Sequence, residues 1–204
     1  MTDADSQPAQ APEMVPIRRK DRAVTDESWI EEMLAKAPSG VLATSRDGQP
    51  FVNMNVFVYD PSVKCIYLHT AKEGQTRANV EQNERVCFCV YEMGRLLPAM
   101  YARNFSVEYS GVVVFGHVGI VTDEAEASAS LQLLLSKYAP HLKPGEHYRP
   151  ITSNEIAQTT VYRIKIDRWS GKRKVAPADH PGAFHFGESA APPWADWREQ
   201  EAKS

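Results

Sequence analysis

The fold is decided by the stretch His69-Thr70-Ala71-Lys72-Glu73-Gly74-Gln75-Thr76-Arg77-Ala78-Asn79. It follows an alternating apolar run at 63–68, which is typical of a strand, and continues into a helical pattern through Val80. The strand therefore delivers a histidine to a turn that contains a cation, a glycine, an amide and a hydroxyl. Backbone N–H groups at a helix start point toward an anion, and Lys72 or Arg77 adds positive charge. The residues alone leave two interpretations open, a phosphate site and a solvated basic turn, and the Walker phosphate-loop pattern is not present.

The bulk composition describes an ordinary globular chain. It has 204 residues, of which 43% are hydrophobic and 24% charged, enough for one domain with a real core. The net charge of -3 gives no reason to expect a nucleic-acid partner. No apolar run has the length of a membrane span, the N-terminus lacks the apolar core of a signal peptide, and the cysteines show neither zinc spacing nor a disulfide framework. We therefore expect a cytoplasmic protein that binds neither nucleic acid nor membrane.

The sequence predicts three regions. Residues 1–24 are a flexible lead-in rich in Pro, Ala and Gln, 25–175 form the folded domain, and 176–204 form an extended arm. A first helix is expected after Thr25 or Asp26, and its apolar face consists of Trp29, Ile30, Met33 and Leu34.

A third helix, after the one expected through Val80, is expected between Asp123 and Tyr138. Asp123 and Glu126 form a capping-box pattern at its start. Its predicted buried stripe consists of Leu131, Leu134, Leu135 and Tyr138.

Elsewhere the apolar period changes from 3.6 to 2, which indicates strands. They are expected at 41–44, 51–59, 63–70, 85–92, 107–121 and 160–169. The segment 107–121 is either one long strand or a pair of strands, with a kink or bulge near Gly111, Gly116 or Gly119. Asp47-Gly48 is a hairpin signal between the first two. On the second strand Asn53 and Asn55 face away from the side that holds Val52, Met54, Val56 and Val58. Six strands with few helices favour a closed antiparallel barrel over a doubly wound sheet.

Two aromatic residues have open interpretations. Trp169 has the same parity as Lys165 and Asp167 on its strand, and a large apolar ring on a polar face needs a ligand or another subunit against it. Tyr109 is either a core or an interface aromatic.

His69 shares its parity with Tyr67 and is either a hydrogen-bonded rim residue or a pocket residue that can transfer a proton near neutral pH.

Three motifs follow one another in a characteristic order. They are the strand–His69-Thr70-x-x-x-Gly74–helix unit, Ser106-Val107-x-Tyr109-x-x-Val112-x-Val114-Phe115-Gly116, and Ile166-Asp167-x-Trp169-Ser170-Gly171-Lys172. Over residues 22–175 the chain resembles the pyridoxamine-5'-phosphate-oxidase-like split barrels, and within them the nitroimidazole-resistance (Nim) group. The resemblance implies a mainly β fold with flanking α-helices, namely a six-stranded antiparallel split β-barrel. It also implies a homodimer with FMN in two clefts between subunits, for which Trp169 and the Val112-Val113-Val114 run supply apolar surface.

The resemblance implies site residues and chemistry as well. Lys72, Gln75 and Thr76 occupy the turn where the family holds the FMN phosphate, although many members have a basic residue in place of Gln75 or Thr76. Trp169 and Lys172 match the motif that approaches the cofactor across the dimer, and His69 matches a histidine near the flavin and the substrate. His69 is therefore the candidate catalytic residue, and no metal site is expected. The candidate cofactor-binding residues are Asn55, Val56, His69, Thr70, Lys72, Gln75, Thr76, Tyr109, Trp169 and Lys172.

Several function classes remain open at this point. The first is an FMN-dependent oxidoreductase that reduces nitroaromatic or other electron-poor small molecules, with NAD(P)H as a donor. The second is a binding protein that holds FMN, or haem through His69, without turnover. A third is a barrel for another cofactor, such as a deazaflavin. The Arg-rich pattern for pyridoxamine phosphate is not evident, so that substrate is not assigned.

Overall fold

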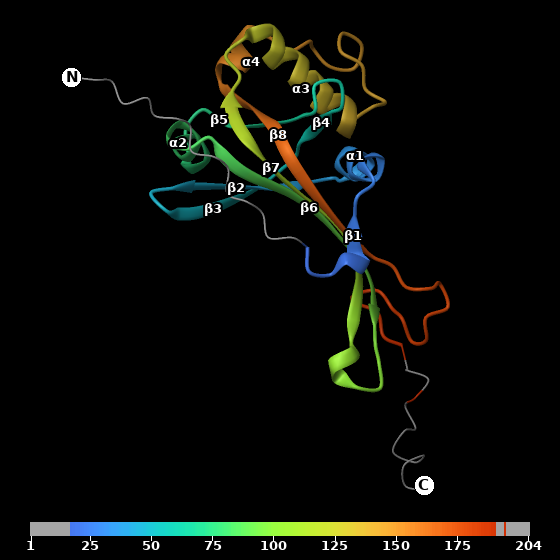
Figure 1. Ribbon diagram of the computed structural model, residues 1–204. Coiled ribbons are helices and arrows are strands. Elements are labelled where there is room, and N and C mark those ends of the chain that lie inside the picture. The colour runs from blue at the N-terminus through green and yellow to red at the C-terminus, as the bar shows by residue number, and fades with distance from the viewer. Residues whose placement is uncertain (1–16, 191–193, 195–204) are drawn as a thin grey trace, which may run out of the picture.

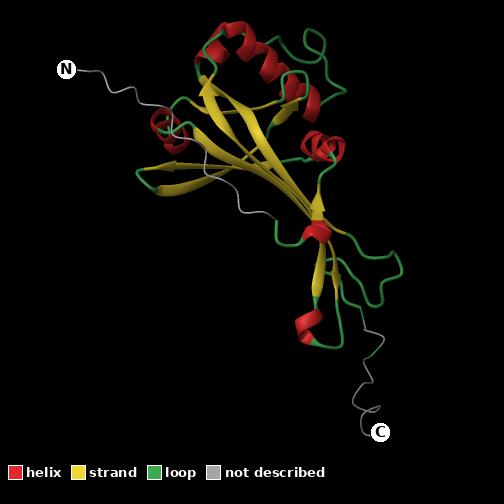
Figure 2. Cartoon of the chain, viewed as in Figure 1, coloured by secondary structure: helices red, strands yellow, loops and turns green. Residues whose placement is uncertain are grey.

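The framework of the protein is one antiparallel sheet of eight strands in a computed structural model, which describes residues 17–190 and 194. The strand order is β3-β2-β6-β7-β8-β5-β4, and β1 pairs with β8. Figures 1 and 2 show that the sheet curves, with α3 (Glu124–Tyr138) and α4 (Ser153–Ala157) at one end and a long hairpin at the other. The strands are β1 (Ala23–Val24), β2 (Gly40–Arg46), β3 (Gln49–Asn55), β4 (Val58–Asp60), β5 (Cys65–Ala71), β6 (Arg85–Leu97), β7 (Ser106–Ile120) and β8 (Thr159–Lys174).

The expected closed barrel of six strands is wrong in two respects. The sheet has eight strands, and within the described residues its end strands β3 and β4 do not pair with each other, so it is not closed. The strand expected at 51–59 breaks into β3 and β4 because the chain turns inward at Phe57, whose side chain is fully buried. The antiparallel, mainly β architecture with flanking helices is confirmed.

The hairpin between β2 and β3 is confirmed at the expected dipeptide. Asp47 and Gly48 both have positive φ, 51° and 79°, as a two-residue turn of the primed type requires. The turn fixes the register in which Val41 lies opposite Met54.

The first helix, α1 (Glu27–Lys36), begins as expected. Asp26 is its N-cap and accepts from the Ser28 backbone N–H at 3.0 Å. Ile30 and Leu34 are buried under it, and Trp29 and Met33 are partly buried against the same core. The expected apolar face is therefore confirmed.

The expectation for α3 (Glu124–Tyr138) is confirmed at its start and only in part along its length. The Asp123 side chain caps it by accepting from the backbone N–H of Glu126 at 2.7 Å. The Glu126 carboxylate accepts hydrogen bonds from Tyr67 at 3.0 Å and Arg163 at 2.8 Å, so it ties the helix to β5 and β8. In the predicted stripe Leu134 is buried and Leu131 partly buried, whereas Leu135 and Tyr138 are more exposed than a buried stripe requires.

Two apolar clusters lie on opposite faces of β5. The larger is enclosed by the curved sheet and α1, and it includes Phe57, Phe88 and Ile66. The smaller lies under α3 and includes Tyr67 and Leu134. Both faces of β5 are thus covered, which explains its run of apolar residues without polar alternation.

A β-bulge in β8 reverses the expected orientation of Trp169. Phe115 lies opposite Arg168 and Gly116 opposite Ile166, so Asp167 is an extra residue. Past it the alternation is shifted, and Trp169 packs on the larger core, with its ring 6.4 Å from that of Tyr59. The expectation that Trp169 lies on a polar face is therefore wrong.

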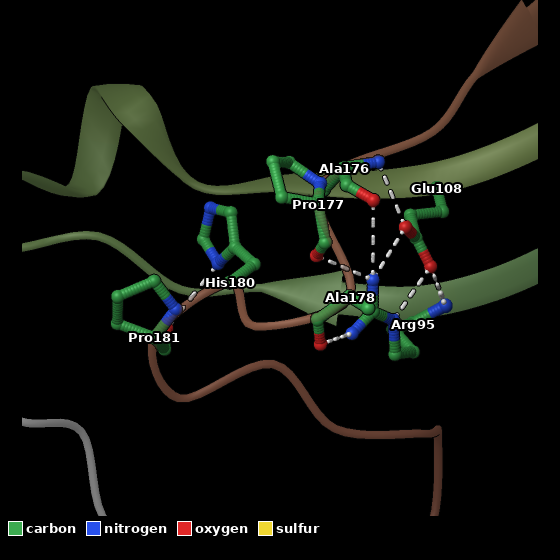
Figure 3. A network of polar contacts seen from close by, with 7 residues as sticks. All are labelled: Arg95, Glu108, Ala176, Pro177, Ala178, His180 and Pro181. Atoms are coloured by element: carbon green, nitrogen blue, oxygen red, sulfur yellow. Dashed lines mark hydrogen bonds and ion pairs between the residues drawn. The ribbon is translucent and has the colours of Figure 1, made fainter.

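The end of β6 and the start of β7 form a projecting hairpin, and the segment that follows β8 is bound to it (Figure 3). Arg95 donates to both carboxylate oxygens of Glu108, at 2.9 and 2.8 Å, and to the carbonyls of Pro177 and Ala178 at 3.0 and 2.9 Å. Leu96 and Phe184 exchange backbone hydrogen bonds. The described part of the expected arm is therefore fixed to the hairpin.

The three-region division itself stays a prediction. Residues 1–16 of the expected lead-in, and 191–193 and 195–204 of the arm, lie outside the described residues. The end of the lead-in forms β1, where Ala23 and Val24 lie opposite Lys172 and Gly171. Within the described part of the chain no helix is long and apolar enough to cross a membrane.

Candidate cofactor site at the start of helix α2

The turn after β5 leads directly into α2 (Gln75–Gln82), and the first backbone N–H groups of this helix receive no side-chain cap. Its N-cap is Gly74, with φ of 142°, a conformation that a side chain disfavours. A Cβ at Gly74 would meet no atom within 4 Å, so the space in front of the helix is open. Unsatisfied N–H groups and the helix dipole both favour an anion at this point.

Three predicted side chains lie at this helix start but do different things. Lys72 is exposed in the turn and adds a positive charge. Thr76 is buried, at 5% exposure, in the first turn of α2. Gln75 turns along the helix, where its amide donates to Asn79 at 2.6 Å. Lys72 and Thr76 are therefore the side chains best placed to meet an anion.

Strand β3 lies beside the same helix start. Asn53 donates to the Thr76 hydroxyl at 3.2 Å, and its neighbour Asn55 donates to the Asn53 carbonyl at 2.8 Å. Val56, just past the end of β3, is exposed. Asn55, Val56 and Thr76 are thus brought to one region, and Asn53 joins them although it was not predicted as a site residue. Its shared parity with Asn55 was the signal that could have indicated it.

His69 and Thr70 face opposite sides of β5. The Thr70 hydroxyl lies 3.1 Å from that of Tyr162, at the end of the larger core near α2. His69 points to the other face and is exposed. Partial loss of water around its ring lowers the pKa of His69, so the imidazole is neutral at pH 7. A neutral imidazole can accept a proton or a metal, but it does not share the space of Thr70.

Of the remaining predicted residues, Trp169 packs on the larger core, and Tyr109 and Lys172 lie at the other end of the sheet. Lys172 lies opposite Ala23 of β1, and Tyr109 lies opposite Lys174. Both line one cavity of about 490 Å³. In Figure 1 this end, marked by β1, is far from α2. One chain therefore does not bring Tyr109, Trp169 and Lys172 together with the α2 group.

The outer face of the sheet is apolar across four strands, β3, β2, β6 and β7, and ends in polar residues on β8. Val52 and Met54 of β3 are 57% and 72% exposed, and each starts a row of residues paired across neighbouring strands. Val113 also faces outward, whereas Val112 and Val114 are fully buried, so only one residue of the expected valine run supplies surface. We call the two rows the outer rows: Met54–Val41–Cys89–Val113–Ser170 and Val52–Ala43–Cys87–Phe115–Arg168.

Solved structures share this fold. The flavocytochrome Anf3 of Azotobacter vinelandii matches with a TM-score of 0.70 and 23% identity over 86% of this chain and 80% of that chain. The FAD- and haem-binding protein of Mycobacterium smegmatis matches with a TM-score of 0.68 and 20% identity over 76% and 74%. A candidate 5-nitroimidazole antibiotic resistance protein of Bacteroides thetaiotaomicron matches with a TM-score of 0.61 and 20% identity over 74% and 86%. No curated protein matches the chain.

The sequence itself settles the family. Residues 26–173, which include the α2 turn, the β6–β7 pair and most of β8, match the family described as pyridoxamine 5'-phosphate oxidase. This match confirms the family that the three motifs indicated, and the chain shares its fold with the nitroimidazole-resistance protein. The chain belongs to the pyridoxamine 5'-phosphate oxidase family.

Proposed function

We propose that the protein is a flavin-dependent oxidoreductase that holds the FMN phosphate at the start of α2. The observation that carries the proposal is the uncapped helix start behind Gly74, which opens on free space beside Lys72 and Thr76. Backbone N–H groups, one cation and one hydroxyl are the donors that bind phosphate in proteins. The residues present therefore fit a flavin mononucleotide.

The other predicted residues have roles consistent with this position. Asn55 and Val56 on the β3 side of α2 would lie along the flavin ring, and Gln75 would support the helix through Asn79. The bound flavin supplies two-electron chemistry, with NAD(P)H as donor and an electron-poor small molecule such as a nitroaromatic as acceptor. The chain itself would bind, orient and shield the cofactor. His69 stays the candidate proton donor that the resemblance implies, although its side chain lies on the opposite face of β5 from Thr70.

A homodimer would complete the site. Tyr109 and Lys172 lie at the sheet end opposite α2, so they reach the flavin only from a second copy, whereas the Trp169 ring packs on the larger core. The outer rows offer an apolar face of the kind that proteins rarely leave in water. In a two-fold dimer the same face meets itself, and the β1 end of one subunit can lie beside the α2 end of the other.

A second candidate function is a flavin- or haem-binding protein without turnover. Two solved structures of this fold are described as a flavocytochrome and as an FAD- and haem-binding protein. His69 is exposed and neutral at pH 7, the form that an axial haem ligand requires. A location in the cytoplasm also stays a prediction.

Titration of the purified protein with FMN, riboflavin and haemin tests these proposals. We expect flavin absorption bands with FMN, weaker binding of riboflavin, and oxidation of NAD(P)H when a nitroaromatic is added. A Soret band, or flavin binding without NAD(P)H oxidation, would favour the second candidate.

The variant Lys72→Ala tests the phosphate contact. We expect its affinity for FMN to fall about tenfold to about a hundredfold, because one charge-assisted contact is lost. Riboflavin, which has no phosphate, should bind as it does to the wild type. The exposed Lys36→Ala on α1 is the control. Equal losses for both flavins in Lys72→Ala would contradict a phosphate contact.

A further inference from the structure

A seam of polar side chains joins α2 to the β2–β3 hairpin. Within the described residues its hydrogen-bonded pairs are Asn79–Thr44, Asn83–Ser45, Gln82–Asp47 and Asn53–Thr76. Thr44, Thr76 and Asn79 are buried. Buried hydrogen bonds hold groups in fixed directions, which apolar packing does not. The direction of each hydrogen bond in this seam therefore matters.

Donation runs from helix to hairpin along most of the seam. The Asn79 amide donates to Thr44 at 2.9 Å, and the Asn83 amide donates to Ser45 at 2.9 Å. At Thr76 the direction is reversed, because the Asn53 Nδ2 atom donates to the Thr76 hydroxyl. The same amide lies 3.4 Å from Asn55 Oδ1, which orients it.

The reversed bond decides what the Thr76 hydroxyl can do. A hydroxyl has one proton and accepts through its lone pairs, whereas an amide NH₂ group can only donate. Because Thr76 accepts from Asn53, its own proton is left for another acceptor. Within the part of the chain that the structure describes, that proton is donated to no group. Thr76 lies in the first turn of α2, where the uncapped N–H groups also point outward.

We propose that Asn53 is a positioning residue that makes the Thr76 hydroxyl a donor toward phosphate. The site thereby selects a ligand group that only accepts hydrogen bonds, such as the phosphate of FMN, over the terminal hydroxyl of riboflavin. This inference rests on the proposed function of the α2 site. Asn53 acts through Thr76 and does not itself touch the phosphate.

The ratio of FMN to riboflavin affinity measures this role. In Asn53→Ala we expect FMN affinity to fall about tenfold to about a hundredfold, the range for a hydrogen bond to a charged group, while riboflavin affinity changes little. Asn53→Asp keeps the shape but accepts the Thr76 proton and adds a negative charge, so its loss of FMN affinity should be larger. Thermal unfolding of each variant shows whether it is folded.

A double-mutant cycle separates positioning from general stability. Thr76→Val removes the hydroxyl, and in that background Asn53→Ala should cause no further loss of FMN affinity. Asn83→Ala is the matched control, since Asn83 donates a similar bond from the other end of α2. We expect it to lower the melting temperature and to leave the FMN to riboflavin ratio unchanged.

The outcomes distinguish the inference from the proposed function. If the wild type prefers FMN and that preference survives in Asn53→Ala, or if the losses add in the double variant, the inference is overturned and the phosphate site stands. If the wild type binds FMN and riboflavin equally, the phosphate site is overturned and the inference with it. Loss of the preference in Asn53→Ala but not in Asn83→Ala supports the inference.

Discussion

At the scale of single residues, the structure separates neighbours that the sequence grouped together. His69 and Thr70 are adjacent, yet strand alternation turns Thr70 toward Tyr162 and leaves His69 exposed on the other face. The parity of His69 was predictable, because it follows from a regular strand. The orientation of Trp169 was not, because the extra residue Asp167 that shifts it depends on pairing between β7 and β8. The space needed there is set by Gly116, where a Cβ would lie 2.1 Å from the Lys165 carbonyl oxygen.

The variant His69→Gln tests whether this side chain transfers a proton. Gln supplies a hydrogen bond of similar reach, so the fold and the flavin affinity should be kept. If His69 is a proton donor, the reduction of a nitroaromatic should slow by about 10²- to 10⁴-fold, while flavin reduction by NAD(P)H stays near the wild-type rate. Stopped-flow absorbance follows the two half-reactions separately. An unchanged rate of nitroaromatic reduction would show that His69 does not transfer a proton.

The pH dependence of the same step follows from the direction of the pKa shift. The pKa of His69 is lowered from 6.5 by partial burial, so the ring becomes a cation only as the pH falls below that value. A step that uses the protonated ring should therefore speed up on acidification below about pH 6.5 in the wild type. In His69→Gln this acid limb should be absent.

At the scale of elements, most helices and strands were predictable and their interruptions were not. Runs of apolar residues located β2, β5 and β7, and the Asp47-Gly48 turn gave the β2–β3 register. The break between β3 and β4 was missed because Val56 and Phe57 are both apolar and continue the strand pattern. It depends on α3, far along the chain, whose Tyr138 hydroxyl accepts from the Phe57 backbone N–H at 3.0 Å. The same hydroxyl lies 3.1 Å from the Phe57 carbonyl oxygen and 2.9 Å from that of Pro38.

The variant Tyr138→Phe tests whether the Tyr138 hydroxyl holds the backbone at the break between β3 and β4. Removing the hydroxyl leaves the Phe57 N–H and carbonyl groups without their partner, so we expect the free energy of unfolding to fall by about 1–3 kcal/mol. Urea denaturation followed by tryptophan fluorescence measures it. Tyr148→Phe is the control, since that hydroxyl accepts a single hydrogen bond, from Gln132, near the surface. Equal losses of unfolding free energy in both variants would show that the break between β3 and β4 does not depend on Tyr138.

The contacts of Arg95 and Glu108 with residues 176–178 hold the C-terminal segment on the β6–β7 hairpin, and we call them the latch. They give a second prediction at this scale. The Arg95 guanidinium and the Ala176 backbone N–H hold the pKa of Glu108 at about 2, below its ordinary 4.5. The latch is therefore complete above pH 4.5 and weakens as the pH falls toward 2. Arg95→Met should release 176–190 at neutral pH, seen as faster cleavage there in limited proteolysis. Arg103→Met on the same hairpin should cleave like the wild type.

At the scale of the whole molecule, the predicted cofactor-binding residues do not lie together in one subunit. The α2 group was predictable from a local motif, because strand, turn and helix are contiguous in sequence. The separation of Tyr109, Trp169 and Lys172 from that group was not, since the order β3-β2-β6-β7-β8 is a property of the assembled sheet. The apolar outer rows were predictable only in fragments, because each row takes one residue from each of five strands. A second subunit on that face would both cover it and bring the two ends of the sheet together.

The last prediction is therefore an obligate homodimer, with flavin binding that depends on it. The wild type should be a dimer by light scattering at low micromolar concentration. Met54→Lys and Val113→Lys together place two charges on the outer rows, and their burial against the same face of a partner is strongly unfavourable. We expect this variant to be monomeric, folded by circular dichroism, and unable to bind FMN tightly.

Val63→Lys is the matched control, because Val63 is 55% exposed, between Val113 at 38% and Met54 at 72%, but lies in the β4–β5 turn, away from the outer rows. It should remain a dimer and bind FMN like the wild type. A wild-type monomer would refute the dimer. A monomeric Met54→Lys/Val113→Lys variant that still bound FMN tightly would show that one subunit holds the cofactor alone, and Tyr109 and Lys172 would then have no role in it.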